Sequence, residues 1–377
     1  KILSLNPKSF DAFNNLGLVF RELQDYDIAI KNFRTAISIK EDRADTFNNL
    51  GLIYKDKGQY DEAIKNYKIA IKLNPVFFQA YCNYGVCLHK KRHFKEAINH
   101  YKKSISINPK FVQGYNNLGI IFEETNKFHD AIKYFNLAIN LDPNFIQVYI
   151  NLSKVYIRTN NLDMTISCYN KYLERNPNDE EILVARLHAK KEICDWNGNQ
   201  NTKQIIKFGT LDQPVNPFKL LSFDDNPSRQ FIRSKNYSQS FQKKELQFLE
   251  PKKESKLINI GYFSADFHDH ATMYLMIRLF EIHNKKKFKI FAFSFGDFNK
   301  TYMRNRAKRA FDVFHDVSGL SDIEIANLAR SEEIDIALDL KGYTLNSRPS
   351  IFAFRVAPIQ INYLGYPGTM GASYIDY

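Results

Sequence analysis

Asparagine recurs every 34 residues through the first half of the chain, without slippage. The five copies are Asn15, Asn49, Asn83, Asn117 and Asn151. The same register carries a column of small residues and a column of aromatic residues. Self-similarity at this period indicates one supersecondary unit stacked several times along an axis. We therefore expect the chain to begin with a solenoid and not with a single globular core.

The repeated positions are those of the tetratricopeptide repeat, in which two antiparallel helices form one unit. The small column consists of Gly17, Gly51, Gly85, Gly119 and Ser153. The aromatic column consists of Phe33, Tyr67, Tyr101, Phe135 and Tyr169. Small side chains let the two helices approach closely, and the aromatic rings fill the space between them. The pattern predicts an α superhelix over residues 1–179, with units at about 10–43, 44–77, 78–111, 112–145 and 146–179.

Helix packing does not require the asparagine column, because core positions should be apolar. In a stacked array, identical side chains line one wall, and an amide offers donors and an acceptor that suit an extended peptide backbone. One interpretation is therefore a track that binds acceptor polypeptides. The alternative is that the amides cap or bridge neighbouring helices. The spacing alone leaves both interpretations open.

Composition limits the classes of partner. The 377 residues include 53 Lys and Arg against 41 Asp and Glu, a net charge of +12, but basic and acidic residues are interspersed and no arginine-rich arm is present. This scatter argues against a nucleic-acid partner. No apolar run approaches the roughly 20 residues of a membrane span. The four cysteines, Cys82, Cys87, Cys168 and Cys194, lack Cys-x-x-Cys spacing. Three of them fall on repeat helices, so small core residues of a cytoplasmic protein are expected rather than a disulfide framework or a metal site.

The pattern changes after the fifth repeat. Residues 180–256 are expected to form a capping helix and a connecting region, with a further helix from about Asn226 to Glu245. From Leu257 on, apolar runs of strand length alternate with amphipathic segments. The strands are expected at 257–263, 288–295, 313–317, 334–340 and 359–364. The alternation predicts a parallel sheet covered on both faces, a Rossmann-like α/β lobe over residues 257–377.

Ser321 and Glu324 have the spacing of a capping box, which predicts that a helix begins between the third and fourth strands. In an open α/β sheet, ligands bind outside the carboxyl ends of the strands. Three loops follow strands there and should converge on one edge: 264–272, 341–344 and 365–371.

The first of these loops concentrates two carboxylates and two imidazoles. A metal site through Asp266, His268 and His270 is disfavoured, because alternate residues of a tight loop rarely point to one centre and no fourth ligand is evident. A structural interpretation has Asp266 or Asp269 capping the following helix. His270 is the candidate for catalysis, since a neutral imidazole can accept or steer a proton at physiological pH.

The loop at 365–371 has three glycines around a proline, so its backbone amides could approach phosphate oxygens. Its spacing is neither that of a P-loop nor that of a dinucleotide fingerprint. Arg348 and Arg355 are placed on the helix before this loop, where each is a candidate ligand contact or a structural charge.

Several short motifs occur in a fixed order in the second half. They are Cys194-Asp195-Trp196, Pro217-Phe218, Asp224-Asp225-Asn226-Pro227, Ile260-Gly261-Tyr262, Ser264-Ala265-Asp266-Phe267 with His270, Asp339 to Thr344, Ala357-Pro358-Ile359-Gln360 and Leu364-Gly365-Tyr366-Pro367-Gly368-Thr369. Together with the repeats, these motifs resemble the O-linked N-acetylglucosamine transferase family, and most closely its bacterial branch. The resemblance covers essentially the whole chain, although the repeats alone are generic.

The resemblance implies the first half of a GT-B glycosyltransferase. It implies transfer of N-acetylglucosamine from UDP-GlcNAc to Ser or Thr of polypeptides bound along the superhelix, with inversion and without a metal ion or other cofactor. The implied catalytic residues are His270, as base or as orienting group, and Asp266. The implied donor-binding residues are Thr272, Leu364 and Gly365, and the residues implied to lie near the acceptor are Tyr343, Thr344 and Arg348.

The family's second lobe, which holds most nucleotide-binding residues, would follow Tyr377, so this chain alone is expected to have little or no transferase activity. Pro214-Val215-Asn216 stands where animal members have a histidine-rich stretch, so the acceptor contacts made there are not expected. One alternative is a Spindly-type O-fucosyltransferase using GDP-fucose, but that branch has Asn-Thr-Thr-Gly where this chain has Gly368-Thr369-Met370-Gly371. The other is a repeat scaffold for protein–protein interaction whose lobe is not catalytic.

Overall fold

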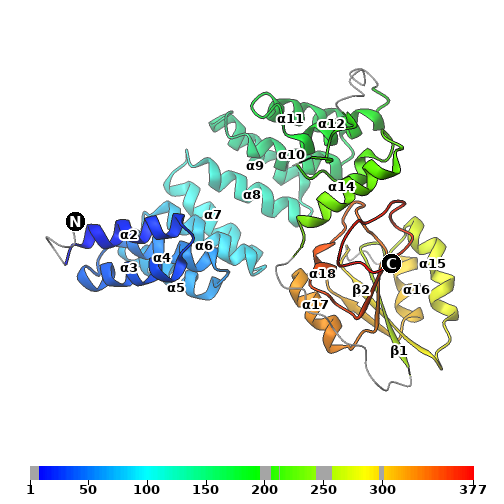
Figure 1. Ribbon diagram of the computed structural model, residues 1–377. Helices are drawn as coiled ribbons and strands as arrows, with labels where there is room; N and C mark the ends of the chain where they lie inside the picture. Colours follow the sequence, from blue (N-terminus) through cyan, green and yellow to red (C-terminus); the bar gives the residue numbers. More distant parts are fainter. Residues whose placement is uncertain (1–7, 196–204, 212, 243–256, 297–300) are drawn as a thin grey trace. The chain divides into compact units, whose positions relative to one another are not determined.

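The computed structural model describes residues 8–195, 205–211, 213–242, 257–296 and 301–377 (Figure 1). The chain divides into two compact units, Lys1–Asn176 and Pro177–Tyr377. Among the described residues, no helix has the length and apolar character needed to cross a lipid bilayer.

The first unit is built from antiparallel helix pairs, as the repeat pattern predicts (Figure 1). The first helices of the pairs are α2 (Phe10–Glu22), α4 (Ala44–Asp56), α6 (Phe78–Lys90), α8 (Val112–Glu124) and α10 (Gln147–Arg158). Their partners are α3 (Tyr26–Ile39), α5 (Tyr60–Leu73), α7 (Phe94–Ile107), α9 (Phe128–Leu141) and α11 (Leu162–Leu173).

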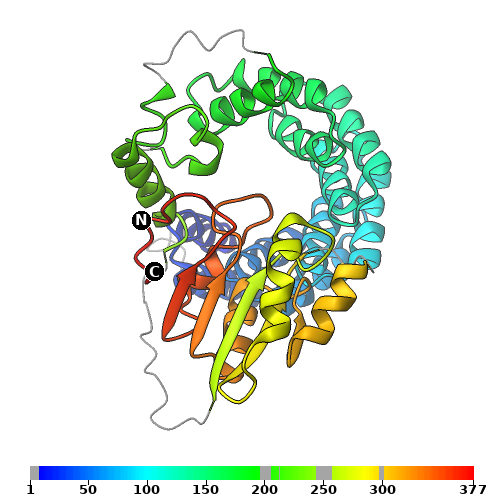
Figure 2. The same ribbon diagram turned by 90° about the vertical axis from the view of Figure 1, so that its right-hand side faces the viewer.

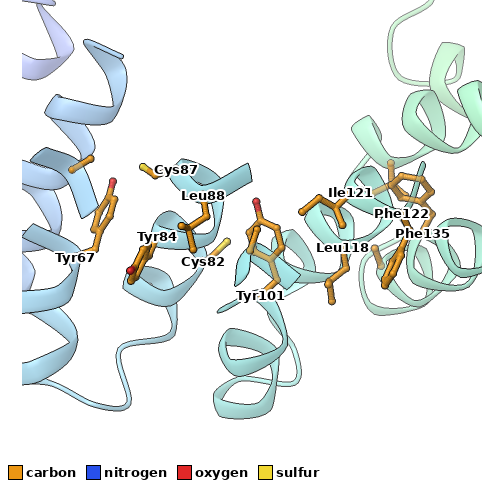
Figure 3. Packing of buried hydrophobic residues seen from close by; sticks show 14 of the residues in the cluster. Tyr67, Cys82, Tyr84, Cys87, Leu88, Tyr101, Leu118, Ile121, Phe122 and Phe135 are labelled. Atoms are coloured by element: carbon orange, nitrogen blue, oxygen red, sulfur yellow. The ribbon is translucent and has the colours of Figure 1, made fainter. Parts of the chain in front are cut away.

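The small and aromatic columns meet inside each pair. A Cβ atom added to Gly85 would lie 2.7 Å from Cε1 of Tyr101, and one added to Gly119 would lie 2.5 Å from Phe135. Both rings are fully buried. Figure 3 shows them in one continuous core with Cys82 and Cys87. Glycine is therefore required where the ring of the second helix presses against the backbone of the first.

Among the described residues, the first helical elements of the second unit are α12 (Glu180–Glu192), the 3₁₀ helix η1 (Pro217–Leu220) and α14 (Pro227–Gln239). The Asn226 side chain caps α14 by accepting from the Arg229 amide. The helix ends at Gln239, earlier than expected, because the chain turns and Phe241 packs edge-on against Tyr237, with ring centroids 5.1 Å apart. Glu245, where the sequence pattern places the end, lies outside the described residues.

Arg233 fixes α14 to the connecting region. Its side chain is fully buried and donates to the carbonyl oxygens of Phe208 and Ile206, each at 2.8 Å. Its other guanidinium nitrogen lies 2.6 Å from the carboxylate of Asp224. The arginines Arg229 and Arg233 hold the pKa of that carboxyl well below its usual range. This pairing lets two charges be buried together.

The remainder of the second unit is a parallel five-stranded sheet of order β3-β2-β1-β4-β5. The strands are β1 (Ile258–Ser264), β2 (Phe288–Ser294), β3 (Val313–Asp316), β4 (Ile336–Asp339) and β5 (Ile359–Asn362). The helices around the sheet are α15 (Ala271–Ile282), α16 (Tyr302–Ala310), α17 (Asp322–Ser331) and α18 (Ser350–Ala353). Figure 2 shows the strands side by side with helices packed against the sheet.

Alternate side chains of β1 enter different cores. Phe263 packs with residues of α17 and α18, whereas Tyr262 packs with residues of α15 and α16. Both faces of the sheet are therefore covered, which explains the continuous apolar runs. The predicted capping box is present, because Ser321 accepts from the Glu324 amide and Glu324 accepts from the Ser321 amide.

The placement of two arginines on a helix was wrong. Helix α18 spans only Ser350–Ala353, so Arg348 precedes it and Arg355 follows it with a φ of 58°. Pro349 starts the short helix, and the left-handed residue Arg355 ends it. Both guanidinium groups have carboxylate partners, Asp322 for Arg348 and Asp376 for Arg355.

Candidate active site

The three predicted loops converge on the carboxyl edge of the sheet. Strands β1 and β4 are neighbours there, with Phe263 opposite Asp339. The chain continues in register beyond β4 and β5, because the amide of Leu340 donates to the Phe263 carbonyl and the amide of Tyr363 donates to the Asp339 carbonyl. The loops after β4 and β5 are thus fixed at their starts by backbone hydrogen bonds.

Close backbone packing explains Gly365 in the third loop. A Cβ atom at this position would lie 1.8 Å from the carbonyl oxygen of Leu340, so only glycine fits. The preceding residue, Leu364, has a φ of 69°, a left-handed conformation that is uncommon for leucine. Its side chain is 46% exposed. The loop therefore holds an apolar side chain out at the edge of the sheet.

Asp266 lies at the bottom of the first loop and is 5% exposed. Its Oδ2 atom accepts from the Nζ atom of Lys341 at 2.7 Å, and Lys341 is equally buried. The same oxygen lies 3.5 Å from Nδ1 of His270. The structure thus brings the two sequence-predicted catalytic residues together, and adds a lysine to them.

His270 itself starts α15. Its backbone is extended, and its Nδ1 atom accepts from the amide of Thr272 at 3.2 Å. The imidazole therefore satisfies one of the free amides at the helix N-terminus. The side chain is 41% exposed, and within the described ranges its Nε2 atom has no hydrogen-bond partner. This nitrogen is free to meet a ligand.

The expectation that Asp266 or Asp269 caps α15 was wrong, because His270 occupies that place. Asp269 instead accepts from the amide of Met303 at 3.1 Å, in the first turn of α16. Asp266 forms an ion pair with Lys341. His268 lies beside His270 with ring centroids 5.8 Å apart. Among the described residues, no group of three His, Cys, Asp or Glu side chains is arranged to hold a metal ion.

The predicted donor-binding residues lie on two of the converging loops. Thr272 is 8% exposed in the first turn of α15, next to His270. Leu364 and Gly365 follow β5. All three are at the carboxyl edge, where the sheet's topology places a ligand.

The residues predicted near the acceptor differ in accessibility. Tyr343 is fully buried and donates its hydroxyl to the Met370 carbonyl at 2.7 Å, so its ring offers no contact to a ligand in this structure. Thr344 is partly buried and donates to the carbonyl of Lys341 at 2.8 Å. The Nε atom of Arg348 donates to Asp322 at 2.6 Å, which is the structural role left open for it.

The asparagine column bridges successive repeats at three of its five positions. Asn83 donates to Asn48, Asn117 to the sulfur of Cys82, and Asn151 to Asn116, at 3.0, 3.3 and 2.9 Å. Each acceptor lies one residue before the column in the previous repeat. Asn15 is exposed, and Asn49 and Asn83 are partly buried. Asn117 and Asn151 are thus buried bridging residues, whereas Asn83 both bridges and keeps some exposed surface.

Sequence reasoning missed two residues of the edge, Lys341 and Asp339. Asp339 is 2% exposed and accepts from the Lys341 amide at 2.9 Å, and burial raises the pKa of its carboxyl to about 7. A signal was present, because both residues flank the end of β4 in a loop already predicted to reach the edge. From the sequence alone, a lysine in such a loop is interpreted as a solvated charge, because its carboxylate partner Asp266 is distant in the chain.

Comparison with known proteins gives matches over both units. Residues 235–377 match the model of Glycosyl transferase family 41, and residues 17–91, 78–145 and 146–179 match models of the tetratricopeptide repeat. The probable UDP-N-acetylglucosamine–peptide N-acetylglucosaminyltransferase SEC of Arabidopsis thaliana is 40% identical over 122 residues, which cover 32% of this chain and 12% of that protein.

The UDP-N-acetylglucosamine–peptide N-acetylglucosaminyltransferase of Caenorhabditis elegans is 28% identical over 205 residues, covering 49% of this chain and 18% of that protein. The chain thus matches less than a fifth of the length of either relative. A mutant O-GlcNAc transferase of Thermobaculum terrenum superposes with a TM-score of 0.50 at 19% identity, over 80% of this chain and 52% of that one, which supports the fold. Residues 235–377 thus match glycosyl transferase family 41, and the residues ahead of them match tetratricopeptide repeats.

Proposed function

We propose that the protein is a glycosyltransferase that moves N-acetylglucosamine from UDP-GlcNAc to a Ser or Thr hydroxyl of a polypeptide. The observation that carries this proposal is the half-exposed imidazole of His270, held beside Asp266 at the carboxyl edge of a lobe that matches family 41. The relatives' names support the choice of donor and acceptor.

The proposed reaction forms a bond between the acceptor oxygen and the anomeric carbon and breaks the bond from that carbon to UDP. The diphosphate leaves with the electron pair and takes up the hydroxyl proton, so that UDP is released. We propose that the reaction inverts the sugar and uses no metal ion. His270 and Asp266 would lie at the reacting atoms, with Thr272, Leu364 and Gly365 against the donor and Thr344 towards the acceptor.

The repeats would bind the acceptor polypeptide. Asn15, Asn49 and Asn83 are the members of the asparagine column that keep exposed surface. An amide that reaches solvent can bond to the backbone of an extended chain without selecting its sequence. Such binding suits a transferase that acts on many proteins.

The test is transfer of labelled sugar to polypeptide by the full-length protein, compared between UDP-GlcNAc and GDP-fucose. We expect transfer from UDP-GlcNAc, lost in His270→Ala and kept in His129→Ala, which changes an exposed histidine of a repeat helix. Preference for GDP-fucose would instead identify the protein as a Spindly-type O-fucosyltransferase.

A second outcome would change the class of protein. If His270→Ala has native turnover, His270 takes no part in the chemistry. If the full-length protein binds polypeptide but transfers neither sugar, it is a repeat scaffold.

A further inference from the structure

Lys341 is a buried cation inside the candidate active site. It is 5% exposed, and its Nζ atom lies 2.7 Å from Oδ2 of Asp266, which is also 5% exposed. A buried charge of either sign is unfavourable unless an opposite charge is in contact with it. Each of the two groups therefore needs the other.

The backbone around Lys341 is held at both of its polar groups. The amide donates to Oδ1 of Asp339 at 2.9 Å, and the carbonyl accepts from the hydroxyl of Thr344 at 2.8 Å. Because the end of β4 and the turn to Thr344 fix this segment, the lysine side chain starts from one defined position. The ammonium group is thus directed to Asp266 by the fold.

The Nδ1 atom of His270 lies near two groups, one of which is a hydrogen-bond donor and the other a hydrogen-bond acceptor. The Thr272 amide, 3.2 Å away, requires Nδ1 to accept a hydrogen bond. The Asp266 carboxylate, 3.5 Å away through Oδ2, would require Nδ1 to donate. One imidazole nitrogen cannot do both, because in a neutral ring each nitrogen is either a donor or an acceptor. The oxygen that competes with Thr272 is the one that already accepts from Lys341.

We propose that Lys341 is a positioning residue, whose ammonium occupies the Asp266 carboxylate so that His270 caps α15 through Nδ1 and presents Nε2–H outward. The proposal rests on the proposed function and adds the role of the histidine. His270 then donates a hydrogen bond to an oxygen of the bound donor or acceptor and orients it. Removing Lys341 leaves a carboxylate that draws the proton to Nδ1.

The tautomer of His270 can be measured without substrate, by long-range ¹⁵N–¹H correlation spectra of the chain labelled in its histidine rings, at a pH where the rings are neutral. His270→Gln assigns the signal among the nine histidines. We expect the Nε2–H pattern in the native protein. An Nδ1–H pattern there would overturn the proposal, whatever the transferase assay gives.

Variants then test the lysine. Lys341→Met is expected to move His270 to the Nδ1–H or doubly protonated form, and Lys341→Met with Asp266→Asn is expected to restore Nε2–H. Lys285→Met, which removes an exposed ion pair to Asp312 in the same lobe, should change nothing. An unchanged tautomer in Lys341→Met would contradict the proposal. If that variant does not fold, an Nδ1–H pattern in the double variant, where no carboxylate faces Nδ1, would contradict it equally.

Discussion

The side-chain amide of Asn151 donates to Oδ1 of Asn116, one repeat earlier, over 2.9 Å. Asn116 is 3% exposed and Asn151 is 8% exposed, so this bond joins two polar groups that water does not reach. The structure thereby separates the buried bridging members of the column, Asn117 and Asn151, from its exposed member Asn15. The separation can be tested by stability and by binding.

Asn151→Ala should destabilise the repeat unit, because the buried amide of Asn116 loses its donor. An unsatisfied buried polar group costs about 1–3 kcal/mol. Asn15→Ala, at an exposed position, should leave stability within about 0.5 kcal/mol. Chemical unfolding followed by circular dichroism measures both. Equal unfolding midpoints for the two variants would contradict the bridging role.

The exposed members of the column, which matter little for stability, should matter most for polypeptide affinity. Asn15→Ala with Asn49→Ala should weaken binding of an unfolded acceptor polypeptide, measured by calorimetry on the full chain, without a shift in the unfolding midpoint. Asn117 and Asn151 are left unchanged in this variant, because they also hold the repeats together. Native affinity in the double variant would leave the column with a structural role alone.

The aromatic column contains a second measurable contrast. The hydroxyl groups of Tyr67 and Tyr101 are buried and have no hydrogen-bond partner among the described residues. Burial raises the pKa of both hydroxyls, as expected for groups without a polar partner. Phe33 and Phe135 occupy the same position in other repeats and are equally buried.

Tyr101→Phe should therefore stabilise the protein by about 1 kcal/mol, because it removes an unsatisfied polar group and keeps the ring. The matched control is Phe135→Tyr, which should destabilise it by a similar amount. Both are measured by thermal unfolding. A loss of stability in Tyr101→Phe would mean that a bound water satisfies the hydroxyl.

The periodic part of the fold was predictable because one local rule repeats. A glycine facing an aromatic residue sixteen positions later, as in Gly85 and Tyr101, defines a helix pair without knowledge of the rest of the chain. The strands were predictable from their apolar runs. The site was predictable only as a set of loops. Asp266 and Lys341 are 75 residues apart, and neither local sequence indicates that the two side chains are in contact. For the same reason the sequence assigned the cap of α15 to an aspartate: local preference favours a carboxylate, and only the fold shows where each carboxylate goes.

Asp339 should make stability depend on pH. Its carboxyl has a pKa raised from 3.8 to about 7 by burial, so the folded chain keeps a proton that the unfolded chain releases near pH 4. Stability should therefore fall as the pH rises from about 4 to about 7, relative to Asp339→Asn, and stay constant above that. At about 1.4 kcal/mol per pKa unit, the largest difference is about 4 kcal/mol. Urea unfolding of both proteins across this range measures it, and parallel pH profiles would show that the carboxyl is ionised throughout.

Gly365 provides the sharpest local test of how the edge is built. In Gly365→Ala the new methyl group would lie 1.8 Å from the Leu340 carbonyl, a backbone atom that is held by β4 and cannot move aside alone. Overpacking of this kind costs about 1–3 kcal/mol, and we expect the loop after β5 to shift as well.

Gly319→Ala is the matched control, because no atom lies within 4 Å of its added Cβ and its φ is not in the left-handed region. It should leave stability unchanged or raise it by about 0.4–1 kcal/mol through the unfolded chain. Thermal unfolding separates the two, and amide chemical shifts of Leu364 and Leu340 report the loop; if Gly365→Ala leaves both unchanged, the two loops do not pack as described.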